Sequence, residues 1–190
     1  EDFVALLNAT AEKLGMTLSH FANPNGLDAQ GHYASAADMA KLAAYALNNQ
    51  DFKRIVSTAS ITIGERYLAN HNKLLRMCEG CVGVKTGFTK AAGRTLVSAA
   101  AREGMTLVCV TLNDPDDWRD HMALLDYGFA NYHMETVLPA GRVAASVLVR
   151  GGTLTTVPLA ADRDLRYPLT GEERLTVVAR VPVSVEAPVV

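Results

Sequence analysis

Apolar residues recur at helical spacing along the first part of this chain. Residues 2–14 predict a helix that ends at Gly15, because glycine often terminates helices, and the apolar side of this helix is formed by Phe3, Leu7, Ala11 and Leu14. Residues 16–21 are then expected to be extended. Residues 22–33 are rich in turn-forming residues and predict a long loop, a kind of segment that is often functional.

Two more helices are predicted after this loop. Ser35 and Asp38 resemble a capping box, with Asp38 in place of the usual Glu, and they mark the start of a helix that ends near Asn48-Asn49. Residues 51–57 predict a short helix. The apolar stripe of the longer helix indicates core packing and not a cofactor site; it consists of Met39, Leu42, Ala43, Ala46 and Leu47.

Alternating apolar and polar residues predict strands in the middle of the chain. The first two form a hairpin around Gly64-Glu65, over residues 58–63 and 66–70. Three antiparallel strands are expected next, over residues 82–89, 95–102 and 105–112. A helix capped by Asp114-Pro-Asp116 should follow them and run to about His133, with one apolar side made of Trp118, Met122, Leu125 and Phe129.

The pattern changes after a predicted linker at residues 138–141. Residues 143–190 show alternating β-branched residues and have turn signals at Gly151-Gly152 and Thr170-Gly171. We therefore predict an α+β domain over residues 1–137, with an antiparallel sheet flanked by helices, and a truncated all-β domain over residues 138–190. About 50 residues of strand make a marginal fold by themselves.

Composition and charge narrow the function classes. The 190 residues are 49% hydrophobic and 20% charged, with a net charge of −2, so the chain has no general attraction for nucleic acid. No apolar run reaches the roughly 18 residues of a membrane span. The chain opens at Glu1 without Met or a signal peptide, so we expect it to be a piece of a longer protein.

The cysteines do not indicate a metal or redox centre. Cys78 and Cys81 have the spacing of half a zinc site, but Cys109 is the only other thiol and no His pair follows at finger spacing. A thioredoxin-like pair should follow a strand and open a helix, whereas these two residues precede a strand. We expect two loop cysteines, free or locally bridged, and neither a metal nor a cofactor.

Two other chemistries are disfavoured by the positions of charged residues. A phosphate-binding P-loop needs Gly where this chain has Glu79 and Val84. Acidic residues cluster where the last helix begins, and the helix dipole favours acids at that end, so capping explains them better than catalysis: Asp114, Asp116, Asp117 and Asp120.

The candidate chemistry lies in Lys85-Thr86-Gly87, on the strand over residues 82–89. Side chains alternate between the two faces of a strand. One face should therefore carry Val82, Val84 and Thr86, and the other should carry Gly83, Lys85 and Gly87. Gly87 has no Cβ, so the backbone of a ligand can approach it, and Lys85 suits an anionic, peptide-like substrate. The same three letters also fit an ordinary exposed strand.

Neighbouring motifs point to a known family. Two motifs flank Lys85-Thr86-Gly87: Asn70-His-Asn-Lys-Leu-Leu75 precedes it and Phe88-Thr-Lys-Ala-Ala-Gly-Arg-Thr-Leu-Val97 follows it. Two more motifs lie further upstream, Asn23-Pro-Asn-Gly-Leu27 and His32-Tyr-Ala-Ser-Ala-Ala-Asp-Met-Ala40. In this order they resemble the serine D-alanyl-D-alanine carboxypeptidases, the low-molecular-mass penicillin-binding proteins, particularly those of spore-forming Gram-positive bacteria. The resemblance covers residues 1 to about 135 and implies a β-lactamase-like fold. The β tail resembles the start of the second domain of these enzymes.

The resemblance implies three motifs around one cleft, Ser-x-x-Lys, Ser-x-Asn and Lys-Thr-Gly. None of the seven serines of this chain has Lys three residues on or Asn two residues on. The chain is therefore expected to hold the C-terminal part of the catalytic domain without the nucleophile, and to be inactive alone.

For the intact enzyme the resemblance implies removal of the terminal D-Ala of peptidoglycan stem peptides through an acyl-serine intermediate. Lys85 would supply positive potential and assist proton transfer, and Thr86 would bind the terminal carboxylate of the substrate. Gly87 and the backbone N–H of Phe88 would complete this wall, with Phe88 as one oxyanion donor. His71 stands where some relatives carry Arg, although a surface histidine also explains it, and His20 and His32 are expected to brace the long loop.

The resemblance also implies partners and a compartment. The expected partners are stem peptides ending in D-Ala-D-Ala and β-lactam antibiotics, with no nucleic acid and with membrane attachment only through a segment outside this chain. The expected location is extracytoplasmic. Two alternatives remain: a class A β-lactamase-like hydrolase, against which the β tail argues, and a non-catalytic cell-wall-binding module, which the missing serine permits.

Overall fold

The computed structural model describes residues 2–188, and contacts within the chain divide it into two compact units, Glu1–Ala130 and Asn131–Val190. The predicted boundary after residue 137 falls inside the second unit, near the end of strand β6 (His133–Leu138). The assignment of a catalytic and a β part to these regions stays a prediction, since compactness does not test what each part does.

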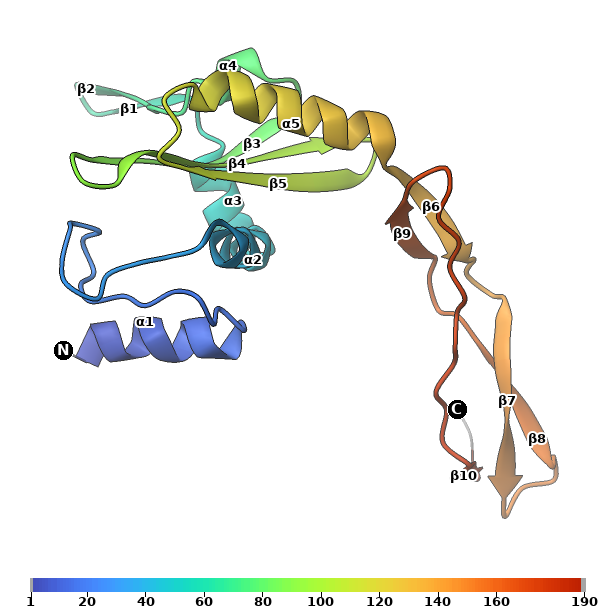
Figure 1. Ribbon diagram of the computed structural model, residues 1–190. Helices are drawn as coiled ribbons and strands as arrows, with labels where there is room; N and C mark the ends of the chain where they lie inside the picture. The colour runs from blue at the N-terminus through green and yellow to red at the C-terminus, as the bar shows by residue number, and fades with distance from the viewer. Residues whose placement is uncertain (1, 189–190) are drawn as a thin grey trace. The chain divides into compact units, whose positions relative to one another are not determined.

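The first unit combines helices with two antiparallel sheets (Figure 1). Its helices are α1 (Asp2–Lys13), α2 (Ala36–Ala46), α3 (Gln50–Val56), α4 (Leu74–Met77) and α5 (Asp117–Asn131). Its strands are β1 (Ser60–Ile63), β2 (Arg66–Ala69), β3 (Cys81–Thr89), β4 (Gly93–Arg102) and β5 (Met105–Leu112). Within the described residues, no helix is long and apolar enough to cross a membrane.

The central sheet has the order β3-β4-β5, with both pairs antiparallel, as predicted. The chain turns between β4 and β5 at Glu103 and Gly104, whose φ angles are 50° and 79°. Two positive φ values are typical of the tight hairpin turn whose twist matches that of paired strands. Strand β3 pairs only with β4 among the described residues, so it forms an edge of the sheet.

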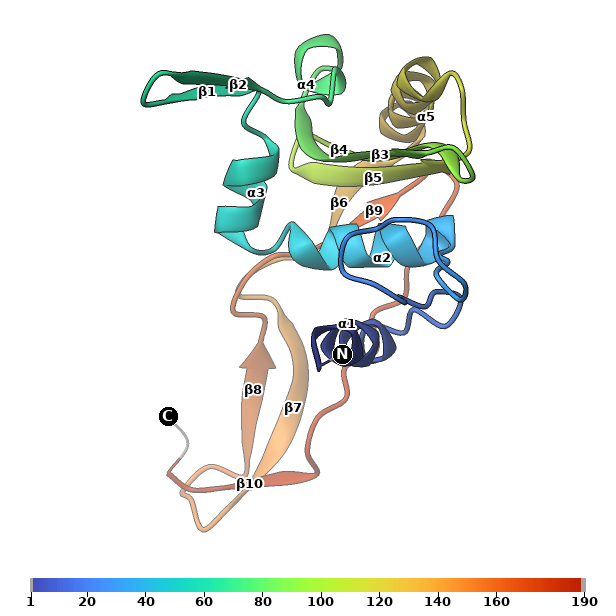
Figure 2. The same cartoon turned by 90° about the vertical axis from the view of Figure 1, so that its left-hand side faces the viewer.

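Helices cover both faces of this sheet (Figures 1 and 2). The core between the sheet and α4 and α5 contains Leu74, Cys78, Leu96, Ala100 and Leu125. The predicted apolar side of α5 is confirmed, because Trp118, Met122 and Phe129 pack against this cluster. Helix α2 lies against β5 and β4 on the other face, and α1 lies beyond it. The prediction of an antiparallel sheet flanked by helices is confirmed.

The start of α2 differs from the predicted capping box. Ser35 Oγ accepts a hydrogen bond from the Asp38 N–H at 3.2 Å, as expected, but Ser19 Oγ, and not Asp38, accepts from the Ser35 N–H. The buried Asp38 carboxylate instead accepts from the Leu18 N–H, Ser19 Oγ and Lys41 Nζ. Burial alone raises the pKa of Asp38, but these hydrogen bonds outweigh it and lower the pKa. Asp38 therefore fastens the segment after α1 to α2.

Other differences concern short segments. Residues 16–21, predicted to be extended, contain a turn and one isolated bridge between His20 and Tyr33, because Asp38 holds Leu18 and Ser19. Residues 133–138, predicted to end a helix and lead into a linker, form strand β6. The alternation predicted for residues 82–89 holds from Gly83 onward but fails at Val82, where the β3–β4 register is irregular.

The second unit consists of strands. Strand β6 pairs with β9 (Leu165–Leu169), while β7 (Val143–Arg150) pairs with β8 (Thr156–Ala160) and, in parallel, with β10 (Ser184–Glu186). The two strand prolines, Pro158 and Pro168, lie in edge strands, where a missing N–H is tolerated. Val147 is the one fully buried apolar residue recorded in this unit's described part, so its core is small.

Candidate functional site

Strand β3 presents the candidate residues at the sheet edge. Lys85 is opposite Val97 and Gly87 is opposite Thr95 in the β3–β4 register, so these four residues share one sheet face. Thr86 and Phe88 belong to the other face, but the edge position lets both reach the same cleft as Lys85 and Gly87. Lys85 is exposed, and its Nζ donates a hydrogen bond to the Thr86 carbonyl oxygen.

Gly87 is required by the neighbouring strand. A Cβ atom at this position would lie 2.4 Å from Thr95 Oγ1. Room for a ligand, the reason predicted from the sequence, is therefore not the only reason for glycine here. The Thr95 hydroxyl occupies space on the cleft face beside Gly87, and it was not predicted as part of the site.

His71 lies on the surface in the segment before α4, which two asparagines hold in place. Asn70 Nδ2 donates to the Thr58 carbonyl oxygen at 3.1 Å, and Asn70 Oδ1 accepts from the Asn72 N–H at 2.9 Å. Asn72 Oδ1 in turn accepts from the Leu74 N–H at 3.1 Å, at the start of α4. This backbone bracing fixes the position from which His71 faces the cleft.

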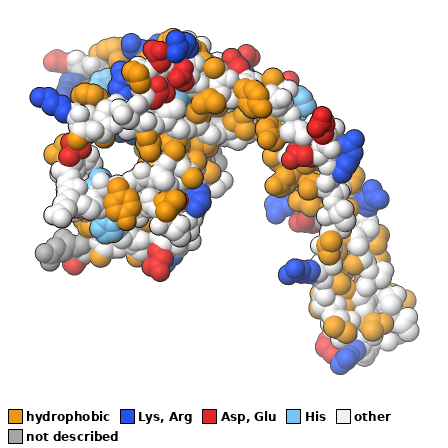
Figure 3. All heavy atoms as spheres, viewed as in Figure 1, with side chains coloured by type: hydrophobic (Ala, Val, Ile, Leu, Met, Phe, Trp, Pro, Cys, Tyr) orange, Lys and Arg blue, Asp and Glu red, His pale blue; other side chains and the backbone are white. Residues whose placement is uncertain are grey.

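All five predicted site residues line one cleft: His71, Lys85, Thr86, Gly87 and Phe88. The cleft has a volume of about 1540 Å³ and is lined by α1, α2, the loop over residues 22–33, the sheet edge and the start of α5. Figure 3 shows the molecule hollowed between the sheet and this loop. Pockets for small ligands usually measure about 300–1,000 Å³, so this cleft can hold an extended peptide. The binding roles of the five residues stay predictions.

The charges around the cleft favour an anion. Lys73, Arg76, Lys85 and Arg94 line it, against the acids Asp28 and Asp117. Asp117 is already engaged, because its two carboxylate oxygens accept from Arg94 Nη2 at 2.6 Å and Nε at 3.2 Å. This ion pair raises the pKa of Arg94. The remaining lysine and arginine groups leave the lining net positive.

The acids predicted to cap α5 make contacts both in the turn before the helix and with the sheet. Asp114 Oδ1 accepts from the Asp116 N–H at 3.1 Å, in the turn directly before α5. Asp117 joins α5 to β4 through Arg94, whose guanidinium also lies 5.4 Å from the centre of the Trp118 ring. Arg94 and Trp118 both line the cleft and were not predicted as site residues.

The loop over residues 22–33 forms a further wall. His20 Nδ1 lies 2.6 Å from the Gly31 carbonyl oxygen, and His32 Nδ1 accepts from the Ala22 N–H at 3.0 Å. Both histidines therefore brace the loop, as predicted. At the base of the loop, Asn8 of α1 bonds both the N–H and the carbonyl oxygen of Phe21.

The described serines do not supply a nucleophile to this cleft. Ser98 Oγ lies 2.6 Å from His121 Nδ1, a pairing that resembles a nucleophile and its base. Both residues are fully buried, however, on the sheet face that packs against α5. The other ring nitrogen, His121 Nε2, is hydrogen-bonded to Thr111 Oγ1 at 3.0 Å. Burial lowers the pKa of His121, against the opposing effect of Asp117, Asp114 and Asp120. These groups build the core.

The three cysteines are free thiols. Burial raises the pKa of Cys81 and raises that of Cys109 to about 11, so both thiols stay protonated at neutral pH. A protonated thiol is a poor nucleophile and a poor metal ligand. In the part of the chain that the structure describes, no three His, Cys, Asp or Glu side chains group as metal ligands.

Sequence comparisons agree with the motifs. Residues 1–116 match the family described as D-alanyl-D-alanine carboxypeptidase. The chain is 31% identical to the D-alanyl-D-alanine carboxypeptidase DacF of Bacillus subtilis over an alignment 160 residues long, which covers 80% of this chain and 41% of that protein. It is 36% identical to the D-alanyl-D-alanine carboxypeptidase DacB2 of Mycobacterium tuberculosis over an alignment 139 residues long, which covers 67% of this chain and 48% of that protein.

Solved structures show the same fold. Penicillin-binding protein 5 from Haemophilus influenzae superposes with a TM-score of 0.74 at 29% identity, over 90% of this chain and 51% of that chain. A D-alanyl-D-alanine carboxypeptidase from Mycobacterium tuberculosis superposes with a TM-score of 0.62 at 36% identity, over 67% of this chain and 53% of that chain. The predicted α+β fold is confirmed, and the chain spans about half the length of these relatives.

Proposed function

From the fact that this chain belongs to the D-alanyl-D-alanine carboxypeptidase family, we propose that it forms one wall of a cleft that binds peptidoglycan stem peptides. The intact enzyme would remove the terminal D-Ala of these peptides through an acyl-serine intermediate. The observation that carries the proposal is the position of Lys85-Thr86-Gly87 at a sheet edge, inside a net positive cleft.

Lys85 and Thr86 would act on different parts of the substrate. The terminal carboxylate of the stem peptide is an anion, and the Thr86 hydroxyl would donate a hydrogen bond to it. The ammonium of Lys85 would provide positive potential where negative charge develops and would assist proton transfer around the serine. His71, on the same wall, would add a second polar contact to the carboxylate.

The backbone of β3 would serve the reacting carbonyl. An edge strand leaves every second N–H unpaired, and the Phe88 N–H would donate to the oxyanion of the tetrahedral intermediate. The second donor would belong to the serine, outside this chain. This role needs only the main chain of Phe88, so it does not depend on the Phe88 ring, which is 70% exposed.

This function implies partners and a place. The substrate class is a peptide ending in D-Ala-D-Ala, and β-lactam antibiotics would acylate the same serine. Peptidoglycan lies outside the cytoplasmic membrane, so the intact protein would work in the extracytoplasmic compartment.

Labelled penicillin tests the proposal. The test protein is a longer one, in which these residues follow a segment with the Ser-x-x-Lys and Ser-x-Asn motifs, and the 190-residue chain is the control. We expect the longer protein to form one slowly released adduct and the control to form none, by mass spectrometry. Thr86→Val should reduce cleavage of peptides with a free carboxylate about ten- to hundredfold, the usual value of a hydrogen bond to a charged group, and Thr86→Ser should restore most of it.

Each other outcome points elsewhere. Rapid turnover of penicillin would indicate a β-lactamase-like hydrolase. No adduct despite an upstream serine would favour a cell-wall-binding module. A stable adduct on the 190-residue chain would contradict its predicted inactivity.

A further inference from the structure

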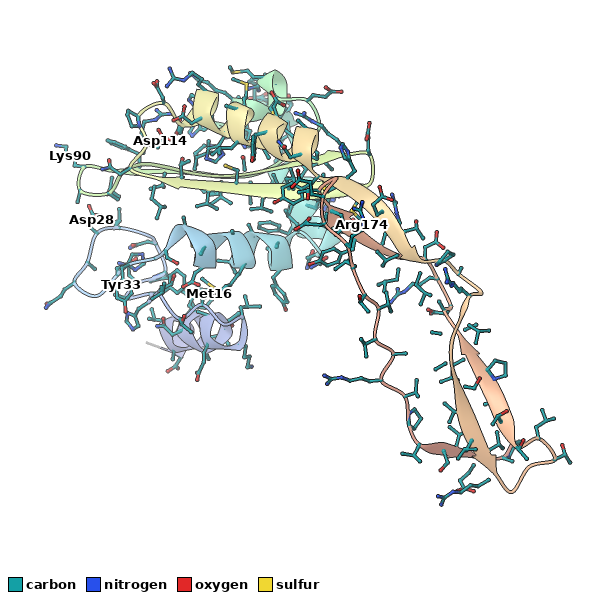
Figure 4. The ribbon with its side chains drawn as sticks, turned by 45° about the vertical axis from the view of Figure 1, so that its right-hand side comes forward. Met16, Asp28, Tyr33, Lys90, Asp114 and Arg174 are labelled. Atoms are coloured by element: carbon teal, nitrogen blue, oxygen red, sulfur yellow. The ribbon has the colours of Figure 1, made fainter. Side chains whose placement is uncertain are left out.

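The tip of the loop over residues 22–33 is tied to the end of the candidate strand. Asp28 Oδ1 accepts a hydrogen bond from Thr89 Oγ1 at 2.8 Å, although 61 positions separate the two residues. Thr89 Oγ1 also accepts from the Ala92 N–H at 2.9 Å. The hydroxyl of Thr89 therefore connects the β3–β4 turn to the loop carboxylate, and each bond polarises the other. Figure 4 shows Asp28 at the loop end that faces the turn carrying Lys90.

The rest of the loop is held by contacts of its own. At its base, His20 and Tyr33 form a β-bridge. Within the tip, Asn23 Nδ2 donates to the Leu27 carbonyl oxygen at 2.8 Å and Asn23 Oδ1 accepts from the Gly26 N–H at 2.9 Å. A loop braced at both places moves as one piece, so its distance from the sheet depends on the contact made by Asp28.

This distance matters because the loop and the strand enclose the same cleft. Asn23, Leu27 and Asp28 line it from the loop, and Lys85 and Phe88 line it from the strand. Thr89 directly follows Phe88. A change at Asp28 is therefore passed to the strand one residue away from the proposed oxyanion donor.

We propose that Asp28 is a positioning residue: by holding Thr89, it fixes the loop against the end of β3 and sets the width of the cleft beside Lys85–Phe88. This inference rests on the proposed function for its effect on substrate. The carboxylate does not touch the reacting groups and acts only through Thr89.

Hydrogen exchange of the 190-residue chain tests the contact without any enzyme activity. Asp28→Ala and Thr89→Val should each speed exchange about tenfold at the loop, and the double variant should be no faster there, because both remove the Asp28–Thr89 bond. Thr89→Val should also speed exchange of the Ala92 N–H, whose acceptor it removes. Thr89→Ser should recover most of the protection. Asp162→Ala, which removes an exposed carboxylate from the second unit, is the matched control and should change exchange at neither place.

Two exchange results would overturn the proposal. One is unchanged protection of the loop in Asp28→Ala. The other is an equal rise across β4 and β5, since this would mean general destabilisation and not release of the loop.

Kinetics of the longer protein test the effect on the site. We expect Asp28→Ala to raise KM for a D-Ala-D-Ala peptide about tenfold while kcat changes less than twofold, since cleft width affects binding more than chemistry. Equal KM values for Asp28→Ala and the parent, in a protein that forms the penicillin adduct, would refute the positioning role. A parent protein that forms no adduct would instead refute the proposed function, and the exchange measurements would still decide whether Asp28 holds the loop.

Discussion

At the scale of single residues, the groups around Lys85-Thr86-Gly87 differ in whether neighbouring side chains already bind them. Arg94 looks from its position like an anion-binding group, but Asp117 holds it bidentately and removes most of its charge from the cleft. Lys85 contacts only a backbone carbonyl oxygen among the bonds recorded for it, so its charge remains available. The space beside Gly87 that a Cβ atom would need is filled by Thr95 Oγ1. These three positions give different expectations for substitution.

Gly87→Ala should destabilise the 190-residue chain by about 1–3 kcal/mol, because the new methyl group overlaps Thr95 Oγ1. In a Thr95→Ala background the same substitution should be neutral or stabilising, because Gly87 has no positive φ and alanine restricts the unfolded chain. Urea unfolding of the four proteins measures both effects. Equal costs of Gly87→Ala in the two backgrounds would show that Thr95 is not the reason for glycine.

At the scale of elements, α5 is fastened to the sheet by polar contacts within its apolar interface. His121 bridges Ser98 of β4 and Thr111 of β5, while Arg102 of β4 bonds Asp126 at 2.8 Å and lies 4.6 Å from the centre of the Phe129 ring. A neutral imidazole donates through one nitrogen and accepts through the other, and each hydroxyl can take either part. A neutral His121 therefore satisfies both hydroxyls, and it is burial that disfavours the charged ring.

The burial of His121 predicts loss of stability in mild acid. Burial lowers the pKa of His121 in the folded state, whereas an unfolded histidine has a pKa of about 6.5. In mild acid, His121 therefore binds a proton in the unfolded state but not in the folded state. As a result, the free energy of unfolding falls as the pH drops below about 6.5. The slope from one proton is at most about 1.4 kcal/mol per pH unit.

Urea unfolding at pH 7.5 and 5.5 measures this slope. His121→Gln should lower stability at both pH values but lose most of the difference between them. The control His133→Gln removes an exposed histidine from β6 and should keep the parent's pH dependence. A parental slope in His121→Gln would mean that other groups bind the proton.

At the scale of the whole molecule, the chain has two compact units of unequal core. The core cluster around Leu96 and Leu125 and the His121 bridge lie entirely in the first unit. The second unit buries Val147 and little else among its described apolar residues. The stability of the first unit should therefore depend on its own contacts.

Truncation after Tyr132, between α5 and β6, should leave a protein that unfolds cooperatively. It should also keep the pH dependence of the full chain, since Ser98, Thr111 and His121 all remain. Urea unfolding of residues 1–132 at the same two pH values checks this. A truncated protein without a cooperative transition would mean that the second unit is needed for the first to fold.

The sequence alone determined the family, most of the elements and the five candidate residues. Periodicity predicts helices and strands because burial repeats every 3.6 or 2 residues, and Lys85-Thr86-Gly87 is recognisable because its neighbours are motifs of the same family. The apolar side of α5 could be predicted for the same reason. These features depend on residues that are close together in the chain.

Only the tertiary structure decided which distant residues meet. Asp38 bonds Leu18 and Ser19 rather than its own helix start, Gly87 makes room for Thr95, and Asp28 reaches Thr89. Each contact joins segments whose separation is set by packing, and neither residue carries a local signal of its partner. The cleft beside Lys85 is likewise a product of how the sheet, α2 and the long loop pack, so its walls could not be predicted from any single stretch.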